Sequence, residues 1–219
     1  MPGLFVFDMD GVIIDSEPLW RIAMVKVFNS SGLPVDAETC AQTTGMRIDE
    51  VIRRWNKKNP FTSDEVQVQN DIEEELCKLI IEQGKAMPGF FAAIELIKSQ
   101  DKKIALATSS SERLVDCVLN TLSIKDHFTH VQSAEKLAYG KPHPEVFMLC
   151  AQATNHHYSN CVAFEDSLNG IISAKSAGMK VIAVPEEKNH HNPKFVVADI
   201  ILRSLEEFTL QTIHQIKTT

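Results

Sequence analysis

The segment LFVFDMDG at residues 4–11 constrains the fold of this chain more than any other. Its first four residues form a short apolar run, which is typical of a buried strand in a parallel sheet, and Gly11 then allows the chain to turn away. Asp8 and Asp10 lie between the strand and the glycine, where both carboxylates of an extended segment lean to the same side. Because ligands bind at the carboxyl ends of strands in open α/β sheets, the pair predicts a catalytic site, although carboxylates at such a turn also act as caps.

Helical periodicity without a strand-like pattern marks the chain from about residue 17 to residue 85. The apolar stripes predict three helices, and the acidic run 73–75 is expected on the solvated face of the third. We predict that residues 16–85 form an all-α cap domain, inserted into a catalytic core made of residues 1–15 and 86–219. A helical insert that follows a strand end is typical of a lid over a site.

Strands and helices alternate along the rest of the chain. Apolar runs predict strands at about residues 103–110, 128–132, 161–166, 180–185 and 198–202. A last helix is expected to carry Leu205, Phe208, Ile213 and Ile216. Repeated strand–helix units with crossovers of this length predict an α/β fold, with a Rossmann-like, doubly wound and mostly parallel sheet.

The composition limits the class of function. Of the 219 residues, 44% are hydrophobic and 23% are charged, as in an ordinary soluble globular protein. The net charge of −7 argues against a nucleic-acid partner or an anionic membrane surface, and no apolar run approaches the length of a membrane span. The five cysteines lack CxxC spacing and are expected to be reduced thiols, so we expect a cytoplasmic protein, with a monomer as the default state.

Three further segments carry residues suited to chemistry. Thr108, Ser109 and Ser110 end a predicted strand at the start of a helix, where hydroxyls and free N–H groups either bind a phosphate or only cap the helix. Glu165 and Asp166 close another predicted strand, either as a functional pair or as acids that favour a helix start. Lys141 lies between these segments in GKPHP, and a lysine before proline is by itself typical of a solvated surface.

Together, four motifs in this order resemble those of the haloacid dehalogenase-like hydrolases: Asp8-x-Asp10, Thr108, Lys141 and Glu165-Asp166. The resemblance covers essentially the whole chain. The helical insert resembles the small cap of the branch that contains β-phosphoglucomutase and sugar-phosphate phosphatases. The segments FDMDGVIIDSEPLW and FEDSLNGI are most similar to bacterial 2-deoxyglucose-6-phosphate or hexitol-phosphate phosphatases, with pseudouridine-5′-phosphatases as close relatives.

The resemblance implies a phosphoric monoester hydrolase that needs Mg²⁺ and acts on small sugar or sugar-alcohol phosphates. The implied metal ligands are the Asp8 carboxylate, the Asp10 backbone carbonyl and Asp166, with Glu165 close by or bound through water. Mg²⁺ suits this chemistry because it binds carboxylates, waters and phosphate oxygens together.

The implied roles of the other residues follow the same pattern. Asp8 attacks phosphorus to give an aspartyl-phosphate, and Asp10 protonates the departing sugar oxygen and then activates water. Lys141, the Thr108 hydroxyl and the Ser109 N–H hold the phosphoryl oxygens.

Three residues of the insert are candidates for substrate contact. Mutases of this branch carry a histidine base where this chain has Trp20, and an indole has no lone pair to act as a base. Trp20 is expected either to stack on a sugar or to belong to the core of the cap. Glu17 either contacts water or substrate hydroxyls or is a solvated hinge acid, and Arg47 either faces the substrate or is solvated.

Several functions remain open at this point. A phosphomutase uses the same catalytic set, although Trp20 argues against it. A true dehalogenase lacks the second acid, so Asp10 argues against that reaction, and a catalytically silent sugar-phosphate sensor would have lost a nucleophile or metal residue. We expect a small phosphorylated metabolite as the binding partner, with hexose, hexitol, deoxyhexose and nucleoside phosphates all possible.

Overall fold

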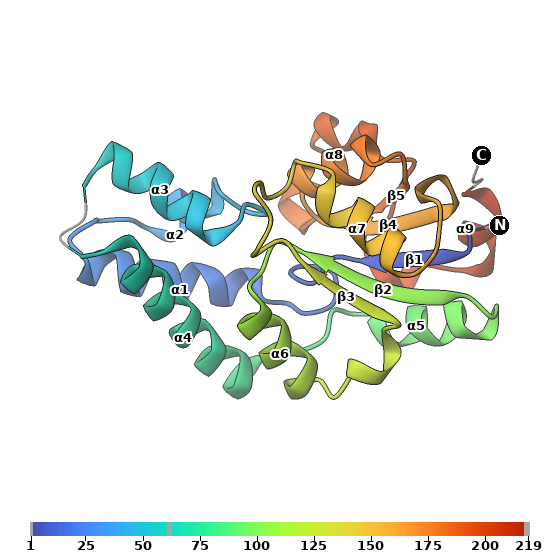
Figure 1. The fold of residues 1–219 in the computed structure, drawn as a ribbon, viewed down its shortest axis with the longest axis horizontal. Helices are drawn as coiled ribbons and strands as arrows, with labels where there is room; N and C mark the ends of the chain where they lie inside the picture. Colours follow the sequence, from blue (N-terminus) through green and yellow to red (C-terminus); the bar gives the residue numbers. More distant parts are fainter. Residues whose placement is uncertain (1, 61–62, 217–219) are drawn as a thin grey trace.

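The computed structural model describes residues 2–60 and 63–216. In this part of the chain, six strands form one sheet in the order β3-β2-β1-β4-β5-β6, and every pairing between neighbours is parallel. The strands are β1 (Leu4–Phe7), β2 (Lys103–Thr108), β3 (His130–Ser133), β4 (Cys161–Glu165), β5 (Lys180–Ala183) and β6 (Ile200–Ile201). The predicted doubly wound α/β fold is confirmed (Figure 1). Since β1 lies between β2 and β4, the chain reverses its direction of winding beside β1, where open sheets bind ligands.

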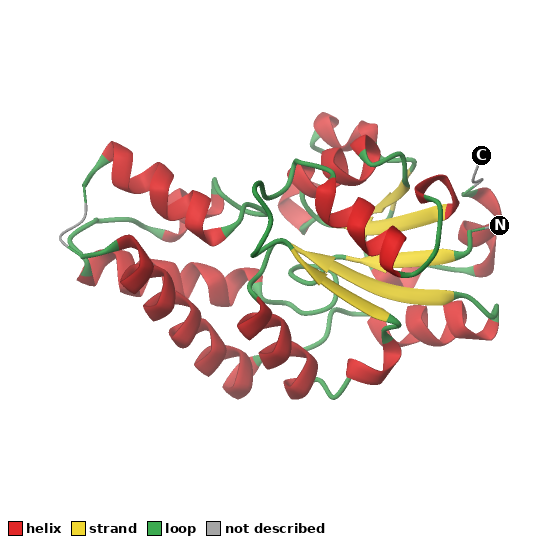
Figure 2. Cartoon of the chain, in the orientation of Figure 1, coloured by secondary structure: helices red, strands yellow, loops and turns green. Residues whose placement is uncertain are grey.

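Helices cover both faces of the sheet, as Figure 2 shows. The helices of this part are α5 (Phe90–Ser99), α6 (Glu112–Thr121), α7 (Glu145–Ala153), α8 (Leu168–Ser176) and α9 (Leu210–Gln215). Side chains alternate along a strand, so Phe5 and Phe7 of β1 join the core on the side of α5, α6 and α9. Leu4 and Val6 join the second core, beneath α7 and α8. Burial on both faces explains why β1 is apolar throughout.

The helical insert lies beyond the carboxyl ends of the strands (Figure 1). It contains α1 (Glu17–Ser30), α2 (Ala37–Ala41), α3 (Ile48–Lys58) and α4 (Glu65–Gln83). Helix α4 packs against α1, α3 and the core helix α6. Three helices were expected from the sequence. The structure adds the short helix α2, which contains too few apolar residues to show a helical pattern in the sequence. None of the described helices combines the length and apolar character needed to cross a bilayer.

The chain enters and leaves the insert through two paired segments. The Asp15 N–H donates to the Lys85 carbonyl at 2.9 Å, and the Met87 N–H donates to the Ile13 carbonyl at 2.9 Å. A bridge between Ile14 and Ala86 lies between these two bonds. The predicted domain boundaries at 15–16 and 85–86 fall in this pairing and stay predictions.

The C-terminal region differs from the expected single helix. Residues Leu205–Glu207 form a 3-10 turn, and α9 starts anew after Thr209, whose side chain accepts from Thr212 N–H. The Thr212 side chain in turn accepts from the N–H of Thr209, so a capping box fixes a helix start inside the apolar pattern. Four other 3-10 turns are Lys125–His127, Tyr158–Asn160, Glu187–Asn189 and Pro193–Val197.

Candidate active site

The turn after β1 brings two acids to the centre of the sheet edge. Asp8 follows the strand directly, and its N–H donates to the Phe164 carbonyl of β4 at 3.0 Å. Gly11 has a positive φ of 72°, and a Cβ atom there would collide with the Asp166 carboxylate. Glycine at this position therefore permits both the turn and the close approach of Asp166.

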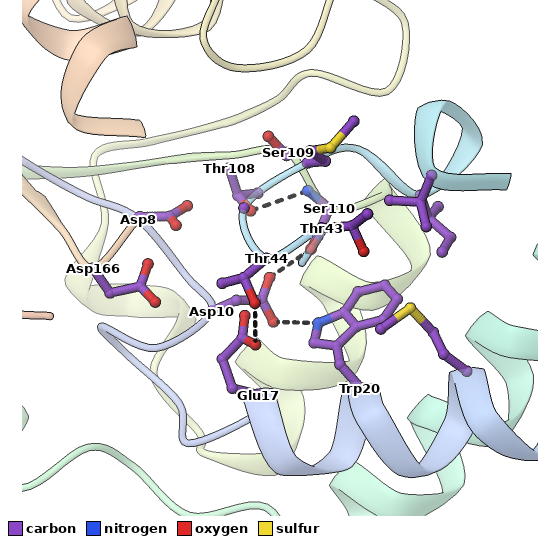
Figure 3. Close-up of a pocket in the computed structure, with 15 residues that line it drawn as sticks. Asp8, Asp10, Glu17, Trp20, Thr43, Thr44, Thr108, Ser109, Ser110 and Asp166 are labelled. Atoms are coloured by element: carbon purple, nitrogen blue, oxygen red, sulfur yellow. Dashed lines mark hydrogen bonds between the residues drawn. The ribbon is translucent and has the colours of Figure 1, made fainter. Parts of the chain in front are cut away.

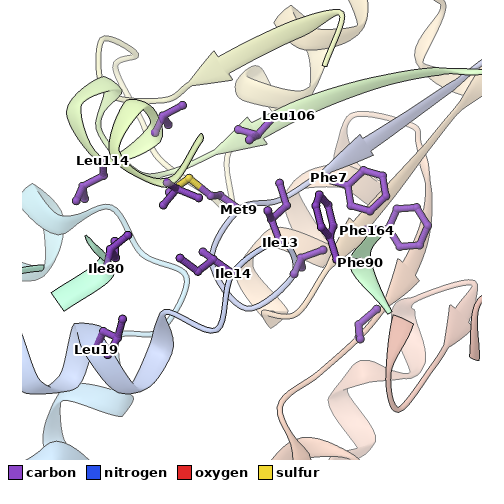
Figure 4. Close-up of a cluster of buried hydrophobic side chains, with 14 of the residues drawn as sticks. Phe7, Met9, Ile13, Ile14, Leu19, Ile80, Phe90, Leu106, Leu114 and Phe164 are labelled. Carbon is purple, nitrogen blue, oxygen red and sulfur yellow. The ribbon is translucent and has the colours of Figure 1, made fainter. Parts of the chain in front are cut away.

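Apolar packing against the sheet and the insert holds this turn in place (Figure 4). Met9, Ile13 and Ile14 are buried between the sheet and the insert. Below them, the rings of Phe7 and Phe164 stack with centroids 4.3 Å apart. Because one apolar cluster continues from the sheet face into α1, α3 and α4, the acidic turn is fixed between the core and the insert.

The pocket at this edge collects residues from the ends of three strands, β1, β2 and β4, and from the insert, and Figure 3 shows how they face one another. Its lining includes Asp8, Asp10, Glu17, Trp20, Thr44, Thr108, Ser109, Ser110 and Asp166. The site residues predicted from the sequence all line this pocket, except for Lys141, Glu165 and Arg47. Lys141 and Glu165 lie behind the lining, next to Asp8, whereas Arg47 lies beside it.

Lys141 is almost fully buried, with 2% of its surface exposed, which excludes the solvated alternative. Its Nζ lies 2.8 Å from Asp8 Oδ1 and 2.6 Å from Glu165 Oε1, and it donates to the Ala107 carbonyl at 3.1 Å. Burial alone would lower the pKa of Lys141, but the Asp8 and Glu165 carboxylates outweigh it and raise the pKa above its ordinary value. The ammonium is therefore charged at neutral pH.

Three buried carboxylates gather beside this lysine. Asp8, Glu165 and Asp166 each offer an oxygen, and these oxygens lie within 4.8 Å of one another. Burial, followed by the charge of Glu165, raises the pKa of Asp8 to about 7. Burial and the charges of Glu17 and Glu165 raise the pKa of Asp166 well above its usual range. One lysine does not neutralise three acids, so an all-oxygen cluster of this kind fits a hard divalent cation.

Glu165 differs from the other two acids in its partners. Its Oε1 pairs with Lys141, and its Oε2 accepts from the N–H and the hydroxyl of Ser167 at 3.3 and 3.2 Å. A side chain at position 170 would collide with this carboxylate, so Gly170 makes room for it. Asp8 and Asp166 are therefore better placed than Glu165 to offer oxygens to a cation.

Asp10 is held by three side-chain donors. Ser16 Oγ and Trp20 Nε1 donate to Oδ1 at 2.5 and 2.9 Å, and Ser110 Oγ donates to Oδ2 at 2.6 Å. Ser16 and Trp20 stand at the start of the insert, whereas Ser110 comes from the loop after β2. The role of Ser16 was not predictable from the sequence, because a serine before a helix indicates only a cap. Here the side chain makes no cap hydrogen bond.

Glu17 also faces the pocket. It accepts a hydrogen bond of 3.1 Å from Thr44 Oγ1, a residue that no sequence signal indicated. Burial, followed by the charge of Asp10, raises the pKa of Glu17 to about 7. The side chain is therefore a partly buried acid of the pocket rather than a solvated hinge acid.

Residues 5–184 of the chain match the family model described as Haloacid dehalogenase-like hydrolase. The chain belongs to this family. It is 38% identical over 206 residues to hexitol phosphatase B of Escherichia coli K12, covering 93% of both chains. It is 32% identical over 184 residues to the phosphorylated carbohydrates phosphatase of Thermotoga maritima, covering 81% of this chain and 82% of the relative.

Solved structures agree with this assignment. The crystal structure of β-phosphoglucomutase from Clostridium difficile superimposes with a TM-score of 0.85 and 26% identity, over 98% of this chain and 96% of that one. The predicted family and its β-phosphoglucomutase branch are confirmed. Since two of the relatives are named phosphatases, the expectation of an enzyme of the phosphatase class is confirmed as well.

The hydrolase also carries a cradle of hydroxyl groups after β2. Thr108 is buried, and its Oγ1 accepts from the Ser110 N–H at 3.1 Å. The buried Ser109 Oγ has no hydrogen-bond partner among the described residues, although it lines the pocket. An unpaired buried hydroxyl that lines the pocket suits an oxyanion ligand.

Arg47 of this hydrolase lies outside the pocket lining. It is buried, with 7% of its surface exposed, so the solvated alternative is excluded. Its guanidinium pairs with Asp49 and donates to two backbone carbonyls of the core. It lines a second pocket that adjoins Ser109, and its contact with substrate stays a prediction.

Proposed function

We propose that this hydrolase is a Mg²⁺-dependent phosphatase of small sugar or sugar-alcohol phosphate monoesters. The observation that carries the proposal is the pairing of two differently held acids in one pocket. Asp8 lies against a buried lysine and the carboxylate cluster, whereas Asp10 is held by three neutral donors. Two acids in different environments suit two different roles, nucleophile and proton carrier.

The carboxylates of Asp8 and Asp166 and the backbone carbonyl of Asp10 would hold Mg²⁺, with Glu165 close by or bound through water. The fit is supported by the gathered oxygens and by the raised pKa values of Asp8 and Asp166, which a cation would relieve. When bound, Mg²⁺ offsets the negative charge of the phosphoryl group.

The phosphoryl group is then transferred twice, first to Asp8 and afterwards to water. An Asp8 oxygen attacks phosphorus as the ester bond to the sugar oxygen breaks, and Asp10 gives its proton to that oxygen. This leaves an aspartyl-phosphate and the free sugar. In the second half, Asp10 takes a proton from a water that attacks phosphorus, and phosphate leaves as Asp8 is regenerated.

The phosphoryl oxygens need positive partners while this charge moves. Lys141 offers an ammonium next to the nucleophile, and the Thr108 hydroxyl and the Ser109 N–H offer donors from the loop after β2. Lys141 is preorganised by Glu165 and the Ala107 carbonyl, so little reorganisation is required during the reaction.

The remaining pocket wall favours a small neutral polyol. Glu17 and Thr44 offer polar groups to substrate hydroxyls, Trp20 offers its aromatic ring, and Met24, Met46, Ile48 and Val51 of the insert add apolar lining. The similarity to hexitol phosphatase B supports hexitol or hexose phosphates as the substrate class.

A phosphomutase is the alternative that the similarity to β-phosphoglucomutase favours. Two features of the pocket speak for hydrolysis instead. Trp20 has no basic nitrogen with which to activate a sugar hydroxyl. The described lining of this pocket contains no lysine or arginine to hold the second phosphate of a sugar bisphosphate.

The test is phosphate release from 2-deoxyglucose 6-phosphate, hexitol phosphates, pseudouridine 5′-phosphate and β-glucose 1-phosphate, each with Mg²⁺ and with EDTA. We expect Mg²⁺-dependent release that is fastest with a hexitol or hexose monophosphate. Conversion of β-glucose 1-phosphate to glucose 6-phosphate without free phosphate would establish the mutase instead. Preference for pseudouridine 5′-phosphate would establish a nucleotide phosphatase, and binding without turnover would establish a sensor.

A further inference from the structure

Two residues of the helical insert form hydrogen bonds with the loop that carries Lys141, residues 134–141. We propose that Arg47 and Glu50 are positioning residues, which hold this loop so that the docking of the insert fixes the place of Lys141. The kinetic part of this inference rests on the proposed phosphatase function, whereas the structural part does not.

Arg47 binds this loop through two hydrogen bonds and is itself oriented by Asp49. Its Nη1 donates to the carbonyls of Ala134 at 2.9 Å and Leu137 at 2.7 Å, thereby bridging two turns of the loop after β3. Its Nε and Nη2 donate to the two Asp49 oxygens at 2.6 and 2.9 Å. Four of the five N–H bonds of the guanidinium are thus used, in a planar geometry that a lysine does not reproduce.

Glu50 holds the other end of the same loop. Its Oε1 accepts from the N–H of Gly140 at 3.0 Å, immediately before Lys141 in the chain. A Cβ atom at position 140 would lie 3.0 Å from Arg47 Cβ and 3.3 Å from both Glu50 oxygens. The insert and the loop are therefore in close contact at a position that glycine permits.

The other contacts of the loop with the core lie mostly at the surface: Lys136 pairs with Glu112, the Glu112 N–H donates to Glu135, and Leu137 is only partly buried. Glu135, Lys136, Ala138 and Tyr139 are exposed, whereas Ala134 and Gly140, two of the three positions bound by Arg47 and Glu50, are buried. Directly after this exposed stretch, Lys141 must reach Asp8 at 2.8 Å inside the core. A segment with few packed side chains opens easily, so the insert supplies the contacts that keep the lysine at the nucleophile.

The chain offers a matched control for Arg47. Arg53 lies on the same helix, α3, and also pairs with Asp49, at 2.8 Å, but its side chain is 57% exposed. Arg53→Ala therefore removes a guanidinium from the same carboxylate without touching the loop. For Glu50, the matched pair is Glu50→Ala, which removes the acceptor, and Glu50→Gln, which keeps an oxygen for the Gly140 N–H.

The experiment combines two readouts on these four variants: kcat and KM with the best sugar phosphate, and amide hydrogen exchange of residues 134–141 followed by mass spectrometry. We expect Arg47→Ala and Glu50→Ala to exchange at least about tenfold faster in this loop, with kcat lowered about tenfold, because each loses a charge-assisted hydrogen bond. Arg53→Ala should match the wild type in both readouts, and Glu50→Gln should recover most of kcat.

Three results would overturn the inference. Unchanged exchange of the loop in both Arg47→Ala and Glu50→Ala would show that the insert does not hold it. A rise in KM with kcat unchanged in Arg47→Ala would make Arg47 a substrate contact instead. Faster exchange with undisturbed kcat would separate the loop from the placement of Lys141. If the wild type itself releases no phosphate, the proposed function fails, while the exchange comparison still decides whether the loop is held.

Discussion

The indole nitrogen of Trp20 donates a hydrogen bond of 2.9 Å to Asp10 Oδ1 (Figure 3). The first helix of the insert thereby orients the acid that we propose as the proton carrier. The bond also accounts for a tryptophan at a place where mutases of this branch carry a base. Trp20 thus belongs to the pocket wall and not only to the apolar core of the insert.

Replacing Trp20 with Phe tests this contact, because the change keeps an aromatic ring and removes the donor. We expect kcat to fall about threefold to tenfold, the usual effect of one lost hydrogen bond, while KM changes less. Steady-state kinetics of phosphate release measure both quantities. An unchanged kcat with a raised KM would show instead that the ring stacks on the sugar.

Lys141→Met tests the buried ion pairs of the core. We expect the free energy of unfolding to fall by about 3–5 kcal/mol, because Asp8 and Glu165 lose the buried cation between them. Urea unfolding in EDTA measures the change. Adding Glu165→Gln should recover part of the loss, and Lys136→Met, in the same loop but exposed, should change the free energy of unfolding little. A loss no larger than that of Lys136→Met would contradict the account.

The sequence predicts most of the fold, since periodicity indicates which face of an element is buried. The apolar stripe of α4 is found as expected, but the neighbouring acid Glu73 is only 4% exposed and not on a solvated face. Its carboxylate accepts from Ser111 Oγ at 2.9 Å and from Gln69 Nε2 at 2.9 Å. Periodicity does not indicate that α4 meets the start of α6, so the burial of this acid was not predictable.

The residues of the candidate site were predictable in part. Asp8 and Asp10 follow from the strand-end pattern alone, because their spacing and the glycine determine the geometry. Lys141 followed only from the resemblance, since a lysine before a proline carries no local sign of burial. Ser16, Thr44 and Glu50 were missed because they act through contacts between the insert and the core, which a single sequence does not report.

Mg²⁺ should stabilise the folded protein through the carboxylate cluster. At about 100 times its dissociation constant, a ligand of the native state adds about 2.7 kcal/mol, which corresponds to a rise in Tm of roughly 5–10 °C for a chain of this size. Thermal unfolding with Mg²⁺ and with EDTA measures the rise. Asp166→Asn should lose most of it, whereas the exposed Asp71→Asn should keep it. An equal rise in both variants would place the ion elsewhere.

Glu17 should make the stability of the metal-free protein depend on pH. Burial and Asp10 raise its pKa from 4.5 to about 7, so the folded state keeps a proton that the unfolded chain has lost. The resulting contribution to stability is complete below pH 4.5 and is lost as the pH rises through 7. Glu17→Gln should therefore be more stable than the wild type by about 1–3 kcal/mol at pH 8 and nearly equal to it at pH 5. Urea unfolding in EDTA at the two pH values tests this, and a constant difference would contradict the raised pKa.

The most direct test of the proposed function is phosphate release by Asp8→Asn beside the wild type, with the best sugar phosphate and Mg²⁺. The amide keeps the size of the side chain but is a far weaker nucleophile, so we expect turnover to be abolished. Circular dichroism should show that the variant remains folded. Full turnover by a folded Asp8→Asn variant would contradict the role of Asp8 as the nucleophile and, with it, the proposed mechanism.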